Sequence, residues 1–516
     1  MQKTGSLVNV LWAFVFIATG GLLFGYVIGI NSNVITEGQL LCPHDYTGSV
    51  GTWRSWGYGQ CYHLTPVAKG ILSSLNLLGA CASSLVCFRY ADVIGRKLEM
   101  QIGGLCYFAG AAVAAAMPVL WGLFLGFLIY GLGVGFAMHA APVYIAEISP
   151  AAVRGMLVSA KEAVIVLGIF LGFLSGYVFS YVGSEGWRLM ISGSGLLALV
   201  MLCGIMGLPQ SPRFLVLQAV LQADVAEDRA GDKDKLRAEA VRSLQFFRHG
   251  TAEDAEEELQ ALMKDLSASF KEEGSELESL LPGGAKQSSW LGAFSYRRPM
   301  VVGCGLVLLQ QVTGQPSILY FATNIFKAAG FGNSASMQAV GIGLVKLLAT
   351  LFTVWKVDDY GRRNLLFVGI SMMSVALALL AGSFGHSHCQ TPHTSLNECT
   401  PGKIIVPKGW SMLTVIAFML YVSGYQVGFG PIAWLMISEV FPLRVRGSAL
   451  SIAAVVNFAS NIGMTVATPV LLQVLKPTGL FVIFLCLAFS SLLFVHLFVP
   501  ETRGKSLEEI EAIMKL

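Results

Sequence analysis

The chain has 516 residues, of which 54% are hydrophobic and 13% are charged, whereas an ordinary soluble domain has about 25% charged residues. This composition argues against a conventional water-soluble enzyme. The formal net charge is only +3, and no basic run interleaved with aromatic residues occurs, so a nucleic-acid partner is not expected either. Charge gathers in residues 209–298, which hold 12 of the 34 Lys and Arg and 16 of the 31 Asp and Glu.

Long apolar stretches dominate the rest of the chain. A helix needs about 20 mostly apolar residues to cross a bilayer, and six such stretches precede the charged segment while six follow it. They cover residues 8–30, 66–88, 100–118, 120–143, 156–181, 187–208, 299–322, 336–357, 364–385, 411–437, 447–472 and 478–498. The sequence therefore predicts an all-α membrane protein with twelve transmembrane helices and both ends on the same side.

Positive charge near the ends of the spans predicts their orientation, because cytoplasmic loops are richer in Lys and Arg. Alternate short loops hold most of these residues, namely Arg89, Arg96, Lys97, Arg154, Lys356, Arg362, Arg363, Arg444 and Arg446. We therefore expect these loops and both termini to be cytoplasmic. The first apolar stretch is too long for a signal-peptide core and lacks a small-residue cleavage site, so we expect it to stay in the membrane.

The spans and the charged segment divide the chain into four predicted parts. These are an N-terminal six-helix bundle (1–208), a cytoplasmic linker (209–298), a C-terminal six-helix bundle (299–498) and a cytoplasmic tail (499–516). Within the linker, residues 213–248 and 251–270 have the pattern of amphipathic helices, with Leu259, Leu262, Met263 and Leu266 at helical spacing. We expect the linker to form a solvated helical cap.

Cysteine placement agrees with this orientation. Six of the ten cysteines fall within predicted spans, and the other four lie in two long loops assigned to the outer side. Disulfides persist in oxidising compartments, and each loop holds one pair, so we predict the disulfides Cys42–Cys61 and Cys389–Cys399. Four unpaired surface thiols are the alternative.

The two halves of the chain repeat each other at the predicted cytoplasmic ends of their spans. The repeated segments are 92–97 with 358–363, 147–155 with 439–447, and 209–213 with 500–504. In each of the first two pairs the acid, Gly and Arg positions keep the same register. A duplicated six-helix unit predicts two bundles related by an axis along the membrane normal, with a solute path between them.

Acid and Arg side chains in these repeats are predicted to form ion pairs between helices. The set comprises Asp92, Arg96, Glu147, Arg154, Asp358, Arg362, Glu439 and Arg446. Gly95 and Gly361 permit the tight turns and close helix approach that such pairs need. Pairs of this kind can stabilise one gate state and break in the other. A purely static structural role is the alternative.

These signatures, in this order, resemble the sugar porter family of the major facilitator superfamily along essentially the whole chain. Segments 310–317, 138–147 and 500–509 look most like the vacuolar glucose and xylose-proton symporter-like branch, and the third class of facilitative glucose transporters is similar. The resemblance implies a twelve-helix major facilitator fold and alternating access to a hexose or pentose.

Polar and aromatic side chains inside the spans suit a sugar, which is neutral, rich in hydroxyl groups and apolar on its ring faces. By resemblance to the family, Gln310, Gln311, Trp434 and Asn457 occupy positions that contact sugar, and Tyr425 lies nearby in the tenth span. Polar residues inside spans often mark substrate paths. The alternative is that they form hydrogen bonds between helices and only hold the bundle together.

Three positions depart from the family pattern. Pro316 stands where the family usually has an Asn, and Gln315 is a candidate to replace the missing amide. Lys346 and Glu162 stand where the family has a sugar-contacting Asn and Gln. We hypothesise that Glu162 and Lys346 approach each other or the sugar across the cavity, with Lys161 nearby. Snorkelling or packed ion pairs of the two lysines are the alternative.

Transport without protons is predicted from a missing pair of residues. Proton-coupled sugar porters characteristically have an acid in the first span and an Arg in the fourth. The corresponding residues here are Val27 and Phe127, and joint loss is informative because either charge alone would be costly without its partner. The sequence therefore favours a facilitative uniporter of monosaccharides such as D-glucose. The alternative is a proton-coupled symporter that uses Glu162, with the proton as second partner; His139 is a weaker proton site.

Other classes of protein receive less support. A transporter-like sugar sensor usually has a long cytoplasmic tail, and only about 17 residues follow the last span. The sequence shows no nucleophile and base at usable spacing, no metal-ligand cluster and no phosphate-binding loop, so we predict no enzyme activity, no cofactor and no metal. We expect a monomer in the lipid bilayer, in the plasma membrane first and the vacuolar membrane second. The start of the sequence lacks the features of an organelle-import leader, which argues only against an organelle-envelope location.

Overall fold

The computed structural model describes residues 4–43, 50–51, 55, 57–225, 230–248, 251–272, 296–389, 404–441, 446–503, 505, 509–510 and 513–514. In these residues nearly all regular structure is helical. The N-terminal half consists of α1 (Thr4–Val34), α2 (Pro66–Ile94), α3 (Arg96–Ala116), α4 (Leu120–Ile148), α5 (Ala151–Phe179), a short 3-10 turn (Ser180–Val182) and α6 (Gly186–Gly207).

The C-terminal half begins after three linker helices, α7 (Pro212–Val225), α8 (Ala230–Arg248) and α9 (Ala252–Glu272). Its helices are α12 (Arg297–Val312), α13 (Gln315–Tyr320), α14 (Ala322–Phe326), α15 (Ala335–Tyr360), α16 (Arg362–Gly385), α17 (Lys408–Val427), α18 (Gly430–Val440) and α19 (Arg446–Phe498). Two short turns, Lys327–Phe331 and Gly332–Ser334, join α14 to α15.

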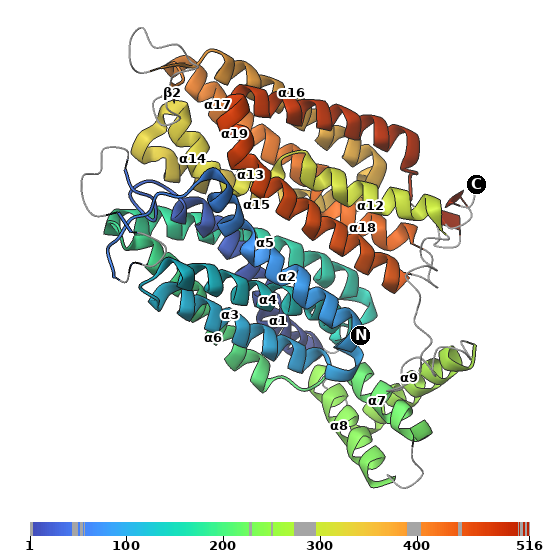
Figure 1. Ribbon diagram of the computed structural model, residues 1–516. Helices are drawn as coiled ribbons and strands as arrows, with labels where there is room; N and C mark the ends of the chain where they lie inside the picture. The colour runs from blue at the N-terminus through green and yellow to red at the C-terminus, as the bar shows by residue number, and fades with distance from the viewer. Residues whose placement is uncertain are drawn as a thin grey trace.

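Figure 1 shows the two halves side by side, with α1–α6 in blue to green and α12–α19 in yellow to red. Both termini lie toward the end that carries α7–α9, which we call the linker end. The opposite end, which carries the Cys42–Cys61 disulfide, is the disulfide end. Each half has its own apolar core, and Ile28, Ile169 and Phe173 of the N-terminal half join the core of the other half. The predicted all-α membrane fold is confirmed.

Ten helices in the described part of the chain are long and apolar enough to cross a membrane. The difference from the expected twelve spans has two causes. Residues 447–472 and 478–498 both belong to α19, which is divided only at Lys476, where φ is 58° and ψ is 170°. The expected span 299–322 is broken at Gly314, so that α12, at 16 residues, is too short to count by itself.

The break at Gly314 has a local cause. Gly314 lies in the left-handed region at φ 101°, where a residue with a side chain is disfavoured. Pro316 follows in the first turn of α13, a position that tolerates proline because its missing amide proton is not needed there. A methyl group on Gly314 would lie 2.5 Å from the Phe484 ring. The chain therefore changes direction at this position and brings α13 against α19.

A second break divides the expected span 411–437 into α17 and α18. Gly428 leaves helical geometry, at φ −89° and ψ −84°, and Pro431 lies in the first turn of α18. The break frees backbone carbonyls in the interior of the bundle. Non-helical backbone at membrane depth is tolerated only where protein or a water-filled cavity satisfies it, so both breaks point to a polar region between the halves.

The linker forms a small packed unit rather than isolated helices. The expected helix 213–248 is wrong as a single element, because α7 and α8 are separate helices. Leu259 of α9 is buried against Leu215 and Leu244, and Leu262 and Met263 pack at the edge of the same cluster; the side chain of Leu266 is outside the described part. The Asn9 side chain donates to the Phe246 carbonyl at 2.7 Å. The unit is therefore attached to the N-terminal half.

The disulfide end contains the expected Cys42–Cys61 disulfide, with 4.8 Å between the two Cα atoms. The six remaining cysteines that the structure describes as free are all in membrane helices. Strands β1 (His388–Cys389) and β2 (Ile404–Ile405) pair antiparallel in a short hairpin between α16 and α17. Cys399 lies outside the described residues, so the disulfide Cys389–Cys399 stays a prediction.

Replacement of Gly314 by Ala should destabilise the protein. The left-handed backbone costs a residue with a side chain about 1–2 kcal/mol, and the added methyl group must also displace the Phe484 ring. We expect a lower unfolding temperature in detergent, measured by scanning fluorimetry. Gly382→Ala is the matched control, since a methyl group there meets no atom within 4 Å; an equal loss in both variants would contradict the explanation.

Candidate functional site

Three amide side chains meet at the two helix breaks. Gln310 of α12 donates from Nε2 to the carbonyl of Phe429 at 3.1 Å and to that of Gly430 at 3.4 Å. Its Oε1 accepts from Asn457 Nδ2 at 3.3 Å and from Gln311 Nε2 at 3.4 Å. Gln310 therefore binds two carbonyls at the start of α18, of which that of Phe429 also accepts from the Ala433 amide, and it connects three segments of the C-terminal half.

Gln311 is the member of this cluster with unused hydrogen-bonding capacity. Its side chain is 5% exposed, and its Oε1 has no hydrogen-bond partner among the described residues. A buried polar atom without a partner costs free energy, so this oxygen is suited to accept a hydrogen bond from a ligand hydroxyl. The expected amides Gln310, Gln311 and Asn457 are thus close together in the structure.

A small, narrow pocket lies beside the broken helix α12–α13. Its lining residues come from α13, α15 and α17 and are Gln315, Ile318, Leu319, Lys346, Tyr421, Val422 and Tyr425. Three of these, Gln315, Lys346 and Tyr425, are expected site residues. The pocket combines apolar walls and aromatic rings with a few polar groups, which is the usual composition of a small-molecule site.

Lys346 is buried in this wall at 3% exposure. Its Nζ donates to Gln426 Oε1 at 2.5 Å and lies 4.9 Å from the centre of the Tyr425 ring. Gln426 Nε2 in turn donates to Thr350 Oγ1 at 2.6 Å. A buried ammonium group needs such partners because it loses its hydration. Gln426 and Thr350 were not identified from the sequence as part of the surroundings of Lys346. The signal available for Thr350 is its position four residues after Lys346 on the same helix.

Glu162 belongs to α5 of the other half, and α5 packs against α15, the helix of Lys346. No direct ion pair joins Glu162 to Lys346 among the residues that the structure describes, since Nζ binds Gln426 instead. Both Glu162 and its neighbour Lys161 are half-buried. The acid and the base thus lie on neighbouring helices of the two halves, and their approach across the cavity stays a prediction.

Trp434 occupies a different position from the pocket residues. It lies half-buried on α18 and packs at the edge of a small apolar cluster that includes Met300, Val307 and Ile437. Its link to the amide cluster is through its own helix, because α18 begins at Gly430, whose carbonyl accepts from Gln310. Contact of Trp434 with a ligand stays a prediction.

At the linker end, the same polar cluster occurs once in each half. Arg96 pairs with Glu147 at 3.3 Å, and Arg362 pairs with Glu439 at 3.1 Å. A hydroxyl group joins each acid: Ser211 donates to Glu147, and Thr502 donates to Glu439 at 2.6 Å. Ser211 and Thr502 lie at matching positions of the repeats 209–213 and 500–504, a role that sequence reasoning missed.

The turn before each Arg also repeats. Gly95 has φ 82° and ψ 153°, and Gly361 has φ 84° and ψ 151°, which favours glycine at both positions. In the C-terminal half, Glu501 accepts from the backbone amides of Arg362 and Arg363, both at 3.1 Å. These amides begin α16, and a carboxylate is favourable at a helix N-terminus.

The remaining expected gate residues do not form described pairs. Arg154 lies exposed on α5, and no ion pair of its side chain occurs in the described part of the chain. The side chains of Asp92, Asp358 and Arg446 are outside the described residues. The two observed pairs each join helices of one half, so they do not bridge the halves.

Hydrogen bonds between the halves gather at the disulfide end. Ser32 Oγ and Thr323 Oγ1 lie 2.9 Å apart, and Asn33 Oδ1 accepts from Thr323 at 3.2 Å and from Ser336 at 2.8 Å. Asn324 donates to the carbonyl of Ile35 and Lys327 donates to that of Glu37, both just after the end of α1. Burial lowers the pKa of the Lys327 ammonium, which the nearby Glu37 partly offsets. The halves are thus held together at this end.

Comparison with known proteins identifies the family. Residues 12–514 match the family described as "Sugar (and other) transporter". The chain belongs to this family of sugar transporters. It is 39% identical to "D-xylose-proton symporter-like 3, chloroplastic" of Arabidopsis thaliana over 98% of its own length and 82% of that protein. It is 29% identical to the "Glucose transporter GlcP" of Staphylococcus epidermidis, with 96% of each chain covered.

The fold comparison agrees with the family. The chain is similar to the xylose transporter XylE from E. coli in a partially occluded inward-open conformation, with a TM-score of 0.71 and 22% identity over 97% of this chain and all of that one. The predicted resemblance to sugar porters is confirmed. The protein is a multi-pass membrane transporter of sugars, not an enzyme.

Replacement of Gln311 by Ala should weaken sugar binding without loss of the fold. Removal of one hydrogen bond to a ligand costs about 1–1.5 kcal/mol, so we expect a rise in the half-saturation concentration for uptake of about tenfold. Gln39→Ala is the matched control, because Gln39 is a buried amide that bonds only within the N-terminal half. Unchanged uptake kinetics in Gln311→Ala would contradict a role of this amide in binding.

Proposed function

We propose that this chain carries a monosaccharide, D-glucose or another hexose, by facilitated diffusion. The observation that supports the proposal best is the amide cluster of Gln310, Gln311 and Asn457 at two helix breaks, with one buried amide oxygen left without a partner. Gln315 and Tyr425 extend this polar surface into the pocket. Neutral donors and acceptors beside aromatic rings match a neutral polyol.

Transport proceeds in this proposal by alternating access. The cross-half hydrogen bonds close the disulfide end, while the pairs Arg96–Glu147 and Arg362–Glu439 hold together each half at the linker end. Movement of the halves about the sugar site then opens one end as the other closes. The ion pairs act as gate elements whose contacts change with the state. The proposed gate also includes Asp92, Arg154, Asp358 and Arg446.

The absence of proton coupling is supported by two buried apolar residues. Val27 of α1 is 1% exposed and Phe127 of α4 is 2% exposed, at the positions where proton-coupled relatives are expected to have an acid and an Arg. Neither residue can bind a proton. In this proposal both termini lie in the cytoplasm, which the distribution of Lys and Arg between the loops favours. The proposed location is the plasma membrane first and the vacuolar membrane second, and the proposed working unit is a monomer.

Uptake by purified protein in liposomes tests the transport mode. With labelled glucose, xylose and fructose, we expect equilibration of at least one sugar and no accumulation above equilibrium, with or without an imposed pH gradient. Empty liposomes and liposomes with unlabelled competitor are the controls. Accumulation driven by the proton gradient would overturn facilitated diffusion, and no flux of any sugar would overturn monosaccharide transport.

A second candidate function is proton-coupled transport through Glu162. It is favoured by the position of Glu162 on α5, which packs against the helix of the pocket residue Lys346, and by relatives whose names include "D-xylose-proton symporter-like". In this candidate, protonation of Glu162 would alter the charge balance around Lys346 when sugar binds. Glu162 would thus take the role of the acid and Arg pair of proton-coupled porters, whose positions are occupied here by Val27 and Phe127.

The substitution Glu162→Gln distinguishes the two candidates. Under facilitated diffusion, we expect a changed sugar affinity but the same flux ratio with and without a pH gradient. Under symport, the substitution should abolish accumulation while it leaves exchange of sugar across the membrane intact. Glu185→Gln is a matched control, because Glu185 is an acid at the disulfide end that pairs with Arg188. If Glu162→Gln left affinity and pH dependence unchanged, Glu162 would have no part in the site.

A further inference from the structure

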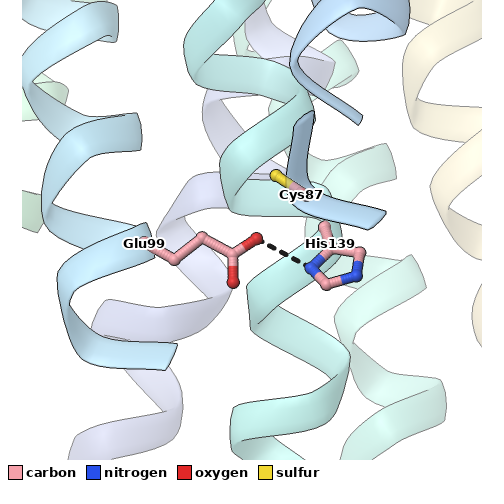
Figure 2. Close-up of side chains that lie close together, drawn as sticks. All are labelled: Cys87, Glu99 and His139. Carbon is pink, nitrogen blue, oxygen red and sulfur yellow. Dashed lines mark hydrogen bonds and ion pairs between the residues drawn. The ribbon is translucent and has the colours of Figure 1, made fainter. Parts of the chain in front are cut away.

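A second polar cluster lies inside the N-terminal half, away from the pocket. Cys87 of α2, Glu99 of α3 and His139 of α4 point toward one another, as Figure 2 shows. One ligand atom from each, the thiol sulfur, a carboxylate oxygen and a ring nitrogen, lies within 4.8 Å of the other two. Glu99 Oε1 and His139 Nδ1 are 2.7 Å apart.

Burial makes this cluster unusual. Cys87 is fully buried and Glu99 is 1% exposed, whereas the His139 side chain is 38% exposed. Glu99 Oε2 is buried and has no hydrogen-bond partner among the described residues. A buried carboxylate that is only partly compensated is costly. The histidine therefore satisfies one oxygen, and the second oxygen is available to another ligand.

We propose that Cys87, Glu99 and His139 form a binding site for a divalent zinc-class ion. Sulfur, imidazole nitrogen and carboxylate oxygen are the three donor types that zinc prefers in proteins, and a fourth position can hold water. The charges also match. A thiolate and a carboxylate together neutralise a divalent cation, while the imidazole binds neutral, so the loaded site has no net charge. The thiol proton leaves as the sulfur binds the metal.

The position of the site determines what the ion does. Its three ligands come from three helices of one half, so a bound ion joins α2, α3 and α4 without crossing to the C-terminal half. His139, the exposed member, gives an approach for the ion. We therefore assign the ion a stabilising role in the N-terminal half, separate from the sugar pocket and from the gate pairs. This role does not depend on which sugar is carried or on the coupling to protons.

Zinc titration of the full-length protein in detergent tests the proposal. After removal of metals with EDTA, addition of Zn²⁺ should raise the unfolding temperature of the wild type by about 2 °C or more, as expected for an ion that binds only the folded state. Cys87→Ser, Glu99→Gln and His139→Asn should each lose the shift. Cys106→Ser is the matched control, a free cysteine in α3 outside the cluster, and should keep it.

An equal zinc shift in the three cluster variants and the wild type, or no shift in the wild type, would overturn the site. A bare Glu99–His139 ion pair predicts this second result. Because a cluster variant could fail to fold, absorption of bound Co²⁺ provides a second measurement that needs none of the three cluster variants. A near-ultraviolet thiolate-to-cobalt absorption band that zinc displaces supports Cys87 as a ligand if Cys106→Ser retains it. Absence of the band overturns the proposal.

Discussion

The structure depends on the requirement that backbone groups at membrane depth find partners within the protein, because the bilayer core offers none. Gly314 and Gly428 break two helices in the interior, and Gln310 binds the two carbonyls at the start of α18, beside the second break. The same amide also positions Gln311 and Asn457. The residues that hold the broken helices together are therefore those that present hydrogen-bonding groups to a ligand.

Because the two halves are duplicated, the same set of polar contacts occurs twice at the linker end. Each half has one Arg–Glu pair, one hydroxyl group and one turn glycine in equivalent positions. Basic side chains also repeat, since Lys97 donates to the Met206 carbonyl and Arg363 donates to the His496 carbonyl. All these contacts remain within one half. Each half is thus stabilised as a separate body, which is a precondition for movement of one half against the other.

Much of this arrangement could be predicted from the sequence because its signals are local. Apolar length gave the spans, and repeated acid and Arg spacing indicated the pairs at Glu147 and Glu439. Side-chain contacts between distant spans could not be read in the same way. The bond from Lys346 to Gln426 and the meeting of Cys87, Glu99 and His139 depend on helix rotation and packing, and no metal spacing such as a Cys-x-x-Cys motif signalled the latter.

Closure at the disulfide end relies on contacts that reverse easily. The halves are joined there by hydroxyl, amide and carbonyl groups, with one lysine that donates to a carbonyl, and no ion pair joins the halves in the described residues. The covalent bond Cys42–Cys61 lies wholly in one half. Hydrogen bonds each contribute about 1 kcal/mol, and neutral partners are not screened by salt. Opening of this end should therefore depend on ionic strength chiefly through the attraction between Lys327 and the nearby Glu37.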